Sequence, residues 1–313
     1  MSGPHPPDAL DVAMDAARLA SAHAKAAMLV ETLPYIRRFF GTTVVVKYGG
    51  NAMTDPDLAH RFAEDMVLLH SVGIRPVVVH GGGPQIGDLL TRLGITSSFV
   101  DGRRVTDADT LDVARMVLVG KVNREIVSAI NVHGPLAVGL SGEDAGLISA
   151  DIGDPELGFV GDVTAVNSGI IDRLLAENLI PVISTIGSDE TGQALNINAD
   201  TVAGAIAAEL VAEKIVYLSD VPGLLRDLDD PDSLITKVSA AEIRDLVGME
   251  IISGGMIPKI EACLDAIDGG VRSAHLLDGR IPHVVLLELF TDQGIGTMIV
   301  PDDDPHPSTQ EPS

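Results

Sequence analysis

Two apolar segments that each end in glycines limit most strongly what this chain can fold into. Residues 44–50 read VVVKYGG, and residues 77–83 read VVVHGGG. Short apolar segments bounded by glycine are typical of strands buried inside a parallel sheet. Glycine lets backbone N–H groups approach an anion closely, and the N-terminus of a following helix adds positive potential. The two segments therefore predict an α/β protein that holds an anion, such as phosphate.

Neither glycine turn matches the best-known nucleotide motifs. The first lacks the G-x-x-x-x-G-K-[ST] pattern of the common P-loop. The second continues as PQIG over residues 84–87, which breaks the G-x-G-x-x-G spacing of dinucleotide-binding proteins. A nicotinamide-dependent dehydrogenase is therefore a weak interpretation.

The charge balance restricts the possible partners. The 313 residues include 45 acidic and 21 basic side chains, which gives a net charge of -24. Nucleic-acid binding is disfavoured, because it requires a basic face. Any anionic substrate must be held by local cations, so lysines and arginines beside glycine turns carry more weight.

The remaining composition favours a cytoplasmic enzyme. With 46% apolar residues, the chain can form a packed core. It has no apolar stretch of about 18 residues that could span a membrane, and its N-terminus lacks a secretory pattern. Cys263 is the only cysteine, which excludes an internal disulfide framework and a cysteine-rich zinc site.

Strand-like and helix-like segments alternate along the chain, which predicts a three-layer αβα sandwich around a central, mostly parallel sheet. A hairpin is expected over 97–106, and two short extended pieces near 159–167. The expected strands are 43–47, 76–80, 136–140, 181–184, 214–219, 272–277 and 297–300. The expected helices are 57–72, 84–93, 108–132, 168–178, 199–211, 239–247, 256–269 and 282–289. Ligands of such sheets bind at the carboxyl ends of the strands.

An extra helix precedes the first strand. Residues 9–33 are rich in Ala, Leu and Met at helical spacing, and Pro34 is expected to kink or restart the helix before Gly41. The helix has no evident partner in the sheet, so it either packs on its own core or contacts another subunit. Residues 1–8 and 301–313 are polar and proline-rich and are expected to be loose.

Cations and amides near the turns are candidate ligands. Lys47 ends the first strand and can reach phosphoryl oxygens. The amides of Gly82 and Gly83 can grip an anion or a carboxyl group. One of the two arginines in the extended segment 103–104 can bind a carboxylate through paired hydrogen bonds, and the other is expected on the surface.

Two further segments carry polar residues to helix starts. Residues 195–200 read LNINAD, which puts Asp200 at or near a helix N-cap. Residues 219–223 (SDVPG) follow a strand and predict another turn that faces a ligand. Lys259 is expected in the first turn of a helix, where its charge opposes the helix dipole, so its presence there suggests a bound anion.

Together these segments resemble the acetylglutamate kinases of the amino-acid kinase superfamily. The resemblance extends from about residue 42 to 300 and depends on an ordered set of motifs. These are KYGGNAM at 47–53, HGGGP at 80–84, GRRVTD at 102–107, LNINAD at 195–200, LSDVPG at 218–223 and GGMIPK at 254–259.

The resemblance implies an enzyme that phosphorylates the γ-carboxylate of N-acetyl-L-glutamate with ATP and Mg²⁺, in arginine biosynthesis. In this interpretation Lys47 and Lys259 neutralise charge on the transferred phosphoryl group, and Asp200 orients the two lysines. The residues that would hold acetylglutamate are Gly82, Gly83, Arg104 and Asn196. The residues that would lie around ATP are Gly49, Gly50, Asp220, Val221, Gly223, Leu225 and Ser253. Mg²⁺ would be held mainly through ATP phosphates, with no metal site made by the protein alone.

The resemblance also implies a domain organisation. Residues 1–41 would be an extension with an oligomerisation helix, and residues 42–300 the kinase domain. Within it, about 42–212 would bind acetylglutamate and about 213–300 ATP. Residues 301–313 would form a disordered acidic tail.

The N-terminal helix and residues 275–296 resemble the arginine-inhibited, hexameric members of the family. The implied arginine site contains Tyr35, His275, Glu288 and Gly294, and the implied assembly is a trimer of dimers joined by the N-terminal helices. The simpler interpretation is that 275–296 only forms a sheet edge.

Other functions stay open at this point. A sibling kinase acting on acetylaminoadipate, glutamate, aspartate, carbamate or a uridine nucleotide is the nearest alternative. A non-catalytic arginine sensor would have kept the fold, but it would be expected to lose Lys47, Asp200 or Lys259, and all three are present.

Overall fold

The computed structural model describes residues 9–100, 102–227, 230–249, 252, 256–292 and 294–303. An eight-stranded sheet has the order β12-β14-β13-β11-β1-β2-β8-β5, and its strand pairs are parallel except β13 with β14. The strands are β1 Thr43–Tyr48, β2 Arg75–His80, β5 Ala137–Ser141, β8 Ile180–Ser184, β11 Lys214–Ser219, β12 Lys237–Ser239, β13 Ala274–Asp278 and β14 Thr297–Val300. The mostly parallel sheet predicted from the sequence is confirmed.

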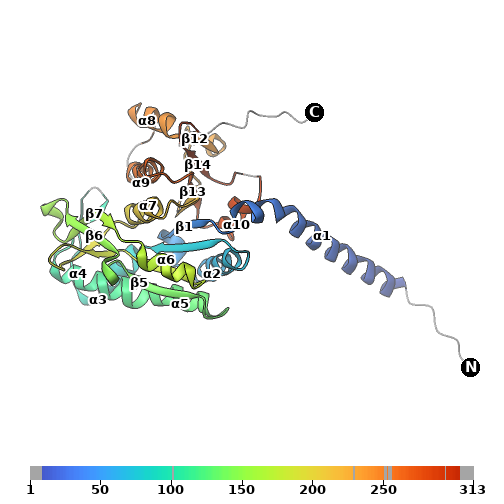
Figure 1. The fold of residues 1–313 in the computed structure, drawn as a ribbon, viewed down its shortest axis with the longest axis horizontal. Helices are drawn as coiled ribbons and strands as arrows, with labels where there is room; N and C mark the ends of the chain where they lie inside the picture. Colours follow the sequence, from blue (N-terminus) through green and yellow to red (C-terminus); the bar gives the residue numbers. More distant parts are fainter. Residues whose placement is uncertain are drawn as a thin grey trace, which may run out of the picture.

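Helices cover both faces of this sheet (Figure 1). Successive residues of a strand point to opposite faces, and Val44 and Val46 accordingly pack in one core cluster while Val45 packs in the other. On the first side lie α2 Pro56–Ser71, α3 Gly83–Leu93, α4 Ala108–Arg115, α5 Asn123–Asn131 and α10 Val284–Phe290. On the second lie α6 Gly169–Ala176, α7 Ala199–Glu209, α8 Ala240–Gly248 and α9 Ile257–Asp268.

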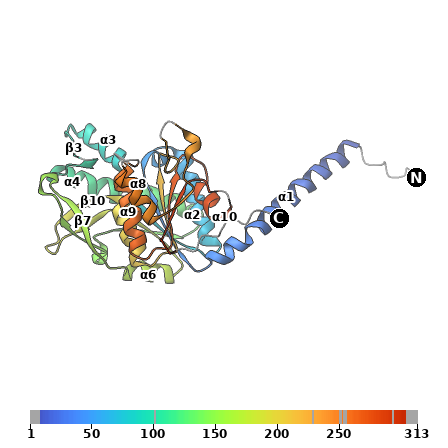
Figure 2. The ribbon, with the colours of Figure 1, turned by 90° about the horizontal axis from the view of Figure 1, so that it is seen from above.

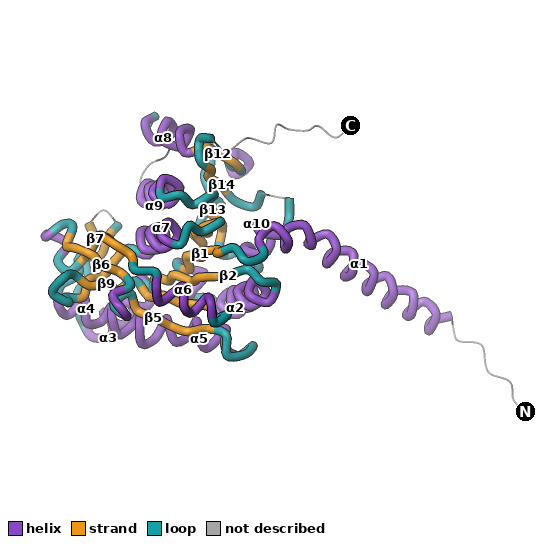
Figure 3. The backbone as a smooth tube through the Cα atoms, in the orientation of Figure 1, coloured by secondary structure: helices purple, strands orange, loops and turns teal. Residues whose placement is uncertain are grey.

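A second, smaller sheet lies beside the main one, as the tube in Figure 3 shows. Four strands, β10-β7-β6-β9, close on themselves, and β3 pairs with β4 in the predicted hairpin. The strands are β3 Phe99–Val100, β4 Arg103–Arg104, β6 Ile148–Ile152, β7 Val160–Val166, β9 Ile186–Ser188 and β10 Ala194–Ile197. The prediction of two extended pieces near 159–167 is wrong, because this stretch is the single strand β7, paired along its length with β6.

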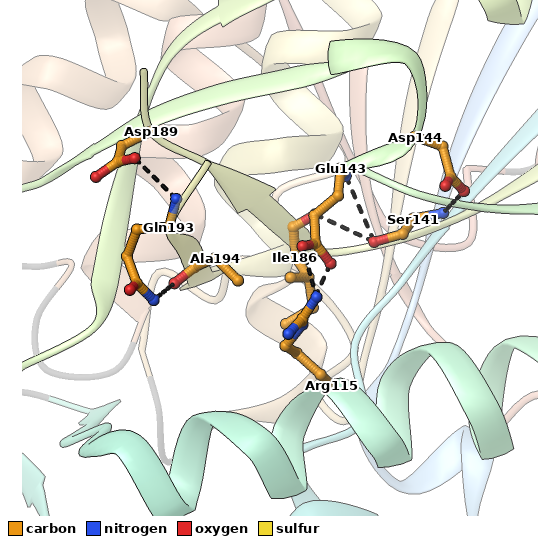
Figure 4. Close-up of polar contacts among 8 residues, drawn as sticks. All are labelled: Arg115, Ser141, Glu143, Asp144, Ile186, Asp189, Gln193 and Ala194. Atoms are coloured by element: carbon orange, nitrogen blue, oxygen red, sulfur yellow. Dashed lines mark hydrogen bonds and ion pairs between the residues drawn. The ribbon is translucent and has the colours of Figure 1, made fainter. Parts of the chain in front are cut away.

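Polar contacts fix the loops beside the small sheet, and one of them joins a loop to α4 (Figure 4). Arg115 of α4 bonds to Glu143 in the loop after β5, with 2.8 Å between Nη2 and Oε1. Asp144 accepts a hydrogen bond from the Ser141 backbone N–H at 2.7 Å. In the turn between β9 and β10, Asp189 accepts from the backbone N–H of Gln193 at 2.9 Å. The loops are therefore held by side-chain acceptors, a common role of aspartate in turns.

The predicted helix 108–132 is interrupted. A π-helical segment, η2 Met116–Val122, separates α4 from α5. Its wider turn carries one more residue than an α-helical turn, and such segments often occur at functional sites. The remaining short helices are η1 Gly50–Met53, η3 Asp144–Gly146, η4 Pro155–Leu157 and η5 Pro231–Ser233.

The N-terminal helix α1, Ala9–Phe39, projects away from the body in both ribbon views (Figures 1 and 2). Of the two effects predicted for Pro34, a restart of the helix is wrong, since α1 continues through it, and a kink stays a prediction. Pro34 removes one N–H, but this part of α1 is largely exposed, so water can satisfy the carbonyl that loses its partner. Leu29 and Val30 are 70% and 68% exposed. None of the described helices is long and apolar enough to cross a membrane.

Candidate active site

The two glycine turns meet at one edge of the sheet. β1 lies between β2 and β11, and Lys47 is in register with Val79 on one side and Tyr217 on the other. Because the strands are parallel, their carboxyl ends share that edge. A cavity of about 290 Å³ opens there. It is lined by Lys47, Gly49, Gly50, Gly81, Gly82, Gly83, Pro84, Ile86, Phe99, Arg104, Leu118, Thr185, Asn196, Ile197, Asn198, Ala199 and Asp200.

Of the three predicted catalytic residues, Lys47 and Asp200 line this cavity, and Lys259 lies next to Asp200. The Nζ atom of Lys47 lies 2.8 Å from Oδ1 of Asp200, and Nζ of Lys259 lies 3.8 Å from Oδ2. Burial favours the neutral acid and raises the pKa of Asp200. The charges and hydrogen bonds of the two lysines outweigh that effect and hold the pKa below its ordinary value. The cluster is therefore an ionised carboxylate between two cations, with one net positive charge.

Local structure explains how Asp200 reaches this position. Asn198 caps α7, and its side chain accepts from the Asp200 backbone N–H at 2.7 Å. A carboxylate in the first turn of a helix is favoured by the helix dipole. Lys259 lies in the first turn of α9, where the dipole is unfavourable for a cation, and the nearby carboxylate of Asp200 partly offsets this.

The second glycine turn packs closely against η2 at the start of α3. A Cβ atom on Gly82 would lie 2.7 Å from the Leu118 side chain and 3.3 Å from that of Val122. A larger residue at position 82 would therefore force the Leu118 side chain of η2 to shift. Gly83 begins α3, so the backbone N–H groups of this helix start, which have no partner within the helix, lie beside the cavity.

Arg104 is held in place from three sides. Nη1 donates to the Ser97 hydroxyl at 2.5 Å, Nη2 donates to the Gly83 carbonyl at 3.0 Å, and the guanidinium lies 4.6 Å from the centre of the Phe99 ring. Arg103 instead pairs with Asp162 at 3.5 Å on the surface. Of the two arginines, only Arg104 lines the cavity, as the prediction of one binding and one surface arginine expects.

Asn196 completes the group expected to hold a carboxylate substrate. Its amide on β10 donates to the Thr106 hydroxyl at 3.3 Å. The small sheet thus brings Asn196 opposite the glycine turn, and all four predicted substrate residues line one cavity. Sequence reasoning missed Ser97, Phe99 and Leu118, which hold Arg104 or shape the turn. Their signal is weak because none belongs to a polar motif.

The predicted ATP residues divide into two groups. Gly49 and Gly50 line the cavity. Asp220 and Val221 follow β11, next to the end of β1. Gly223 has a φ of 143°, and a Cβ there would meet Thr297 at 2.6 Å. Leu225 forms an isolated bridge with Leu234, and Ser253 lies outside the described residues. The role of this second group stays a prediction.

Three of the four residues predicted for an arginine site, His275, Glu288 and Gly294, lie far from the glycine turns in sequence. His275 is buried on β13, and its Nδ1 lies 2.7 Å from Oε1 of Glu288 on α10. Its Nε2 lies 2.9 Å from Nζ of Lys214, a residue that sequence reasoning missed. Tyr35 of α1 donates to Asp292, and Gly294 is exposed in the following loop.

Charges in this second cluster are strongly perturbed. Burial lowers the pKa of Lys214 to about 8 and that of His275 to about 4. Burial opposes ionisation of Glu288, but its hydrogen bond and charge interaction with His275 lower its pKa overall. The cluster is therefore a buried polar network at the junction of β11, β13 and α10. Because β13 lies between β11 and β14, residues 275–296 do not form only the edge of the sheet.

The sequence model of the amino acid kinase family matches residues 42–278. The acetylglutamate kinase of Desulfitobacterium hafniense is 54% identical over 286 residues, which cover 88% of this chain and 96% of the relative. That of Nostoc punctiforme is 56% identical over 274 residues, covering 87% and 92%. The chain belongs to the acetylglutamate kinases of the amino acid kinase family.

Solved structures of the family support the fold. N-acetylglutamate synthase from Neisseria gonorrhoeae complexed with coenzyme A and N-acetyl-glutamate is similar with a TM-score of 0.78 at 28% identity. The match covers 88% of this chain and 63% of that longer chain. The same synthase complexed with coenzyme A and L-arginine gives a TM-score of 0.75. Carbamate kinase from Giardia lamblia, at 18% identity and a TM-score of 0.64, shares the fold alone.

Proposed function

We propose that this protein transfers the γ-phosphoryl group of ATP to the γ-carboxylate of N-acetyl-L-glutamate, in the cytoplasm and within arginine biosynthesis. The observation that carries the proposal is one cavity that joins a carboxylate-binding end to a cationic end. Arg104 and the start of α3 form the first, and Lys47, near Asp200, forms the second. The acetylglutamate kinases that resemble the chain over most of its length support the same reaction.

In the proposed mechanism the substrate is oriented before phosphoryl transfer. Arg104 binds the α-carboxylate through two parallel hydrogen bonds, and Asn196 and the Gly82 and Gly83 amides fix the rest of the molecule. The γ-carboxylate then lies toward Lys47. Holding two repelling anions in line removes much of the entropic barrier of a reaction between them.

Electrostatic stabilisation completes the mechanism. Lys47 and Lys259 balance negative charge that spreads over the transferred phosphoryl oxygens in the transition state. Asp200 keeps both ammonium groups in place and abstracts no proton, because a carboxylate nucleophile is already ionised. The product is an acyl phosphate, so closure of the β3–β4 hairpin over the cavity would protect it from water.

ATP fits the cationic edge of the sheet, where glycine backbone and lysine charge are available beside the ends of β1 and β11. Among the described residues, no group of three or more His, Cys, Asp or Glu side chains is arranged to hold a metal ion. We therefore expect Mg²⁺ to be bound mainly through the phosphates of ATP, where it would neutralise charge on them.

Arginine inhibition is the regulatory part of the proposal. Glu288 could accept the guanidinium of L-arginine, with Tyr35, His275 and Gly294 around it. Support comes from the buried network of Lys214, His275 and Glu288. The hydrogen bond from Tyr35 of α1 to Asp292 adds to it. The exposed apolar side chains of α1 are suited to contacts between dimers in a homohexamer.

ATP-dependent hydroxamate formation tests the proposal directly, because hydroxylamine traps an acyl phosphate. The acceptors to compare are acetylglutamate, acetylaminoadipate, glutamate and aspartate, each with and without L-arginine. We expect acetylglutamate to give the highest kcat/KM and arginine to lower it. A higher kcat/KM for acetylaminoadipate or glutamate would assign the protein to a sibling activity. No hydroxamate with any acceptor would favour a non-catalytic sensor.

A further inference from the structure

His80 is a fully buried histidine directly before the glycine turn of the cavity. Each ring nitrogen has a hydrogen-bonding partner. Nδ1 lies 2.9 Å from the carbonyl oxygen of Gly81, and Nε2 lies 3.1 Å from Nδ2 of Asn123. Neither His80 nor Asn123 lines the cavity. Their pairing is therefore available to act on the backbone of the turn and not on a ligand.

The partners of Asn123 determine where the proton of His80 lies. The Asn123 amide nitrogen also donates to the Val182 carbonyl at 2.9 Å, and its oxygen accepts from Arg124. An amide nitrogen only donates, so Nε2 of His80 must accept. The proton of the neutral ring is then on Nδ1, which donates to the Gly81 carbonyl. Burial lowers the pKa of His80 to about 4, so the ring is neutral near pH 7.

The hydrogen bond from His80 to the Gly81 carbonyl fixes the orientation of the whole Gly81–Gly82 peptide unit. In a trans peptide unit the C=O of Gly81 and the N–H of Gly82 point in opposite directions and lie in one plane. Holding the oxygen toward His80 therefore sets the direction of the Gly82 N–H. On its other side Gly82 packs against Leu118 and Val122 of η2, which leaves the turn little freedom to rotate.

We propose that His80 and Asn123 are positioning residues that orient the Gly81–Gly82 peptide so that its N–H group points at the substrate carboxylate. The inference rests on the proposed function of the cavity and adds residues that act behind it. The π-helical segment η2 takes part, because it ends immediately before Asn123 and supplies the side chains that pack on Gly82.

Two substitutions of His80 separate this role from simple packing. The amide nitrogen of Asn occupies nearly the position of Nδ1 in histidine, whereas that of Gln occupies nearly the position of Nε2. We expect His80→Asn to keep KM for acetylglutamate within about 2-fold of the wild type. We expect His80→Gln to raise KM about 10-fold, which is the loss of one hydrogen bond, with a smaller change in kcat. Equal KM values in the two variants would overturn the proposal.

Two more variants keep the test decisive if the His80 variants do not fold. Asn123→Leu is similar in size but leaves His80 without its donor, so KM should rise as in His80→Gln. Asn131→Ala is the matched control on the same helix α5, where Asn131 bonds to the backbone of Leu136 and Ala137. It should lower the melting temperature without changing KM. If KM rose as much in Asn131→Ala as in Asn123→Leu, the increase would be due to general destabilisation. That result would overturn the proposal.

Hydrogen exchange of the ligand-free protein gives a readout that does not depend on the reaction. The backbone N–H groups of Gly81 and Ile86 bond to the carbonyls of Tyr48 and Gly82 at 3.1 and 2.9 Å. We expect these two amides to exchange faster in His80→Gln than in His80→Asn, and no difference would contradict the positioning role. If the wild type does not phosphorylate acetylglutamate, the proposed function fails while this comparison still decides the role of His80.

Discussion

Asp200 determines the charge of the candidate site although it is not expected to react. Its two carboxylate oxygens lie 2.8 Å from Lys47 and 3.8 Å from Lys259, residues from two distant parts of the chain. Removing one partner of a buried charge pair leaves the other charge uncompensated, which is costly. The three residues should therefore behave as a unit in mutational experiments, with effects that do not add.

Replacing either lysine tests charge stabilisation. We expect Lys47→Ala and Lys259→Ala each to lower kcat by about 10²–10³-fold, which corresponds to about 3–4 kcal/mol for one transition-state donor. Steady-state kinetics with saturating ATP and acetylglutamate measure the effect. Arg92→Ala is the control, because Arg92 is an exposed cation on α3 that lies 3.8 Å from Asp88 and does not line the cavity. A Lys259→Ala variant with nearly wild-type kcat would contradict the assignment.

The lowered pKa of Asp200 predicts a pH effect on stability. The folded pKa lies below the ordinary value of 3.8, so ionisation of Asp200 stabilises the fold above that pH. This contribution is lost as the pH falls through the lower, folded value. We expect the free energy of unfolding of Asp200→Asn to depend less on pH than that of the wild type in this acidic range, as measured by urea unfolding. Parallel pH curves for the two proteins would argue against an ionised Asp200.

At the scale of elements, α1 has two different parts. Residues 18–30 are exposed, while Phe39 near the end of the helix is only 3% exposed. The centre of the Phe39 ring lies 5.4 Å from Nζ of Lys214. Tyr35 bonds to Asp292 from the same end. The exposed part is therefore suited to contacts between subunits, and the last turns connect α1 to the cluster proposed to bind arginine.

Two truncations test these parts separately. A protein that starts at Leu33 loses the exposed turns but keeps Tyr35 and Phe39, so we expect it to be a smaller oligomer with measurable arginine binding. A protein that starts at Gly41 should lose both the hexamer and arginine sensitivity. Light scattering gives the assembly, and inhibition curves give the sensitivity. If the second protein stayed hexameric and arginine-sensitive, the proposed role of α1 would be wrong.

The main sheet and the positions of Lys47, Asp200 and Lys259 at strand ends and helix starts could be predicted from the sequence, because they depend on local patterns. Apolar segments such as 44–46 predict strands, and glycines and lysines indicate where strands end and helices begin. The closure of the small sheet could not be predicted, since it depends on β6 pairing with β9 and β7 pairing with β10, strands that lie far apart in the sequence. Lys214 was missed because a lysine at the start of a strand is expected to be exposed. In the structure Lys214 is buried, with Nζ near the Phe39 ring, and belongs to the network around His275.

The whole molecule carries a net charge of -24, while both proposed substrates are anions. The local cations of the site must attract these substrates against the field of the rest of the protein. At 0.1 M salt, screening strongly reduces that field beyond about 10 Å. Screening weakens the short contacts inside the cavity much less.

This charge distribution predicts an unusual dependence on salt. Between about 10 and 150 mM KCl we expect kcat/KM for acetylglutamate to rise by up to about 2–3-fold, because screening removes long-range repulsion first. Initial rates at low substrate concentration measure it, with sucrose at matched osmolality as the control. A fall in kcat/KM over this range would show that local cations dominate attraction at long range as well.

If α1 joins dimers as proposed, the abundance of the protein becomes part of its regulation. If the apolar turns of α1 find their partners only on other copies of the chain, the fraction of complete assemblies follows mass action. The cavity described above lies within one chain, so catalysis would survive dilution. Inhibition by arginine would be lost before catalysis as the protein is diluted. A cell that makes little of this protein would then inhibit the reaction less strongly than a cell that makes much.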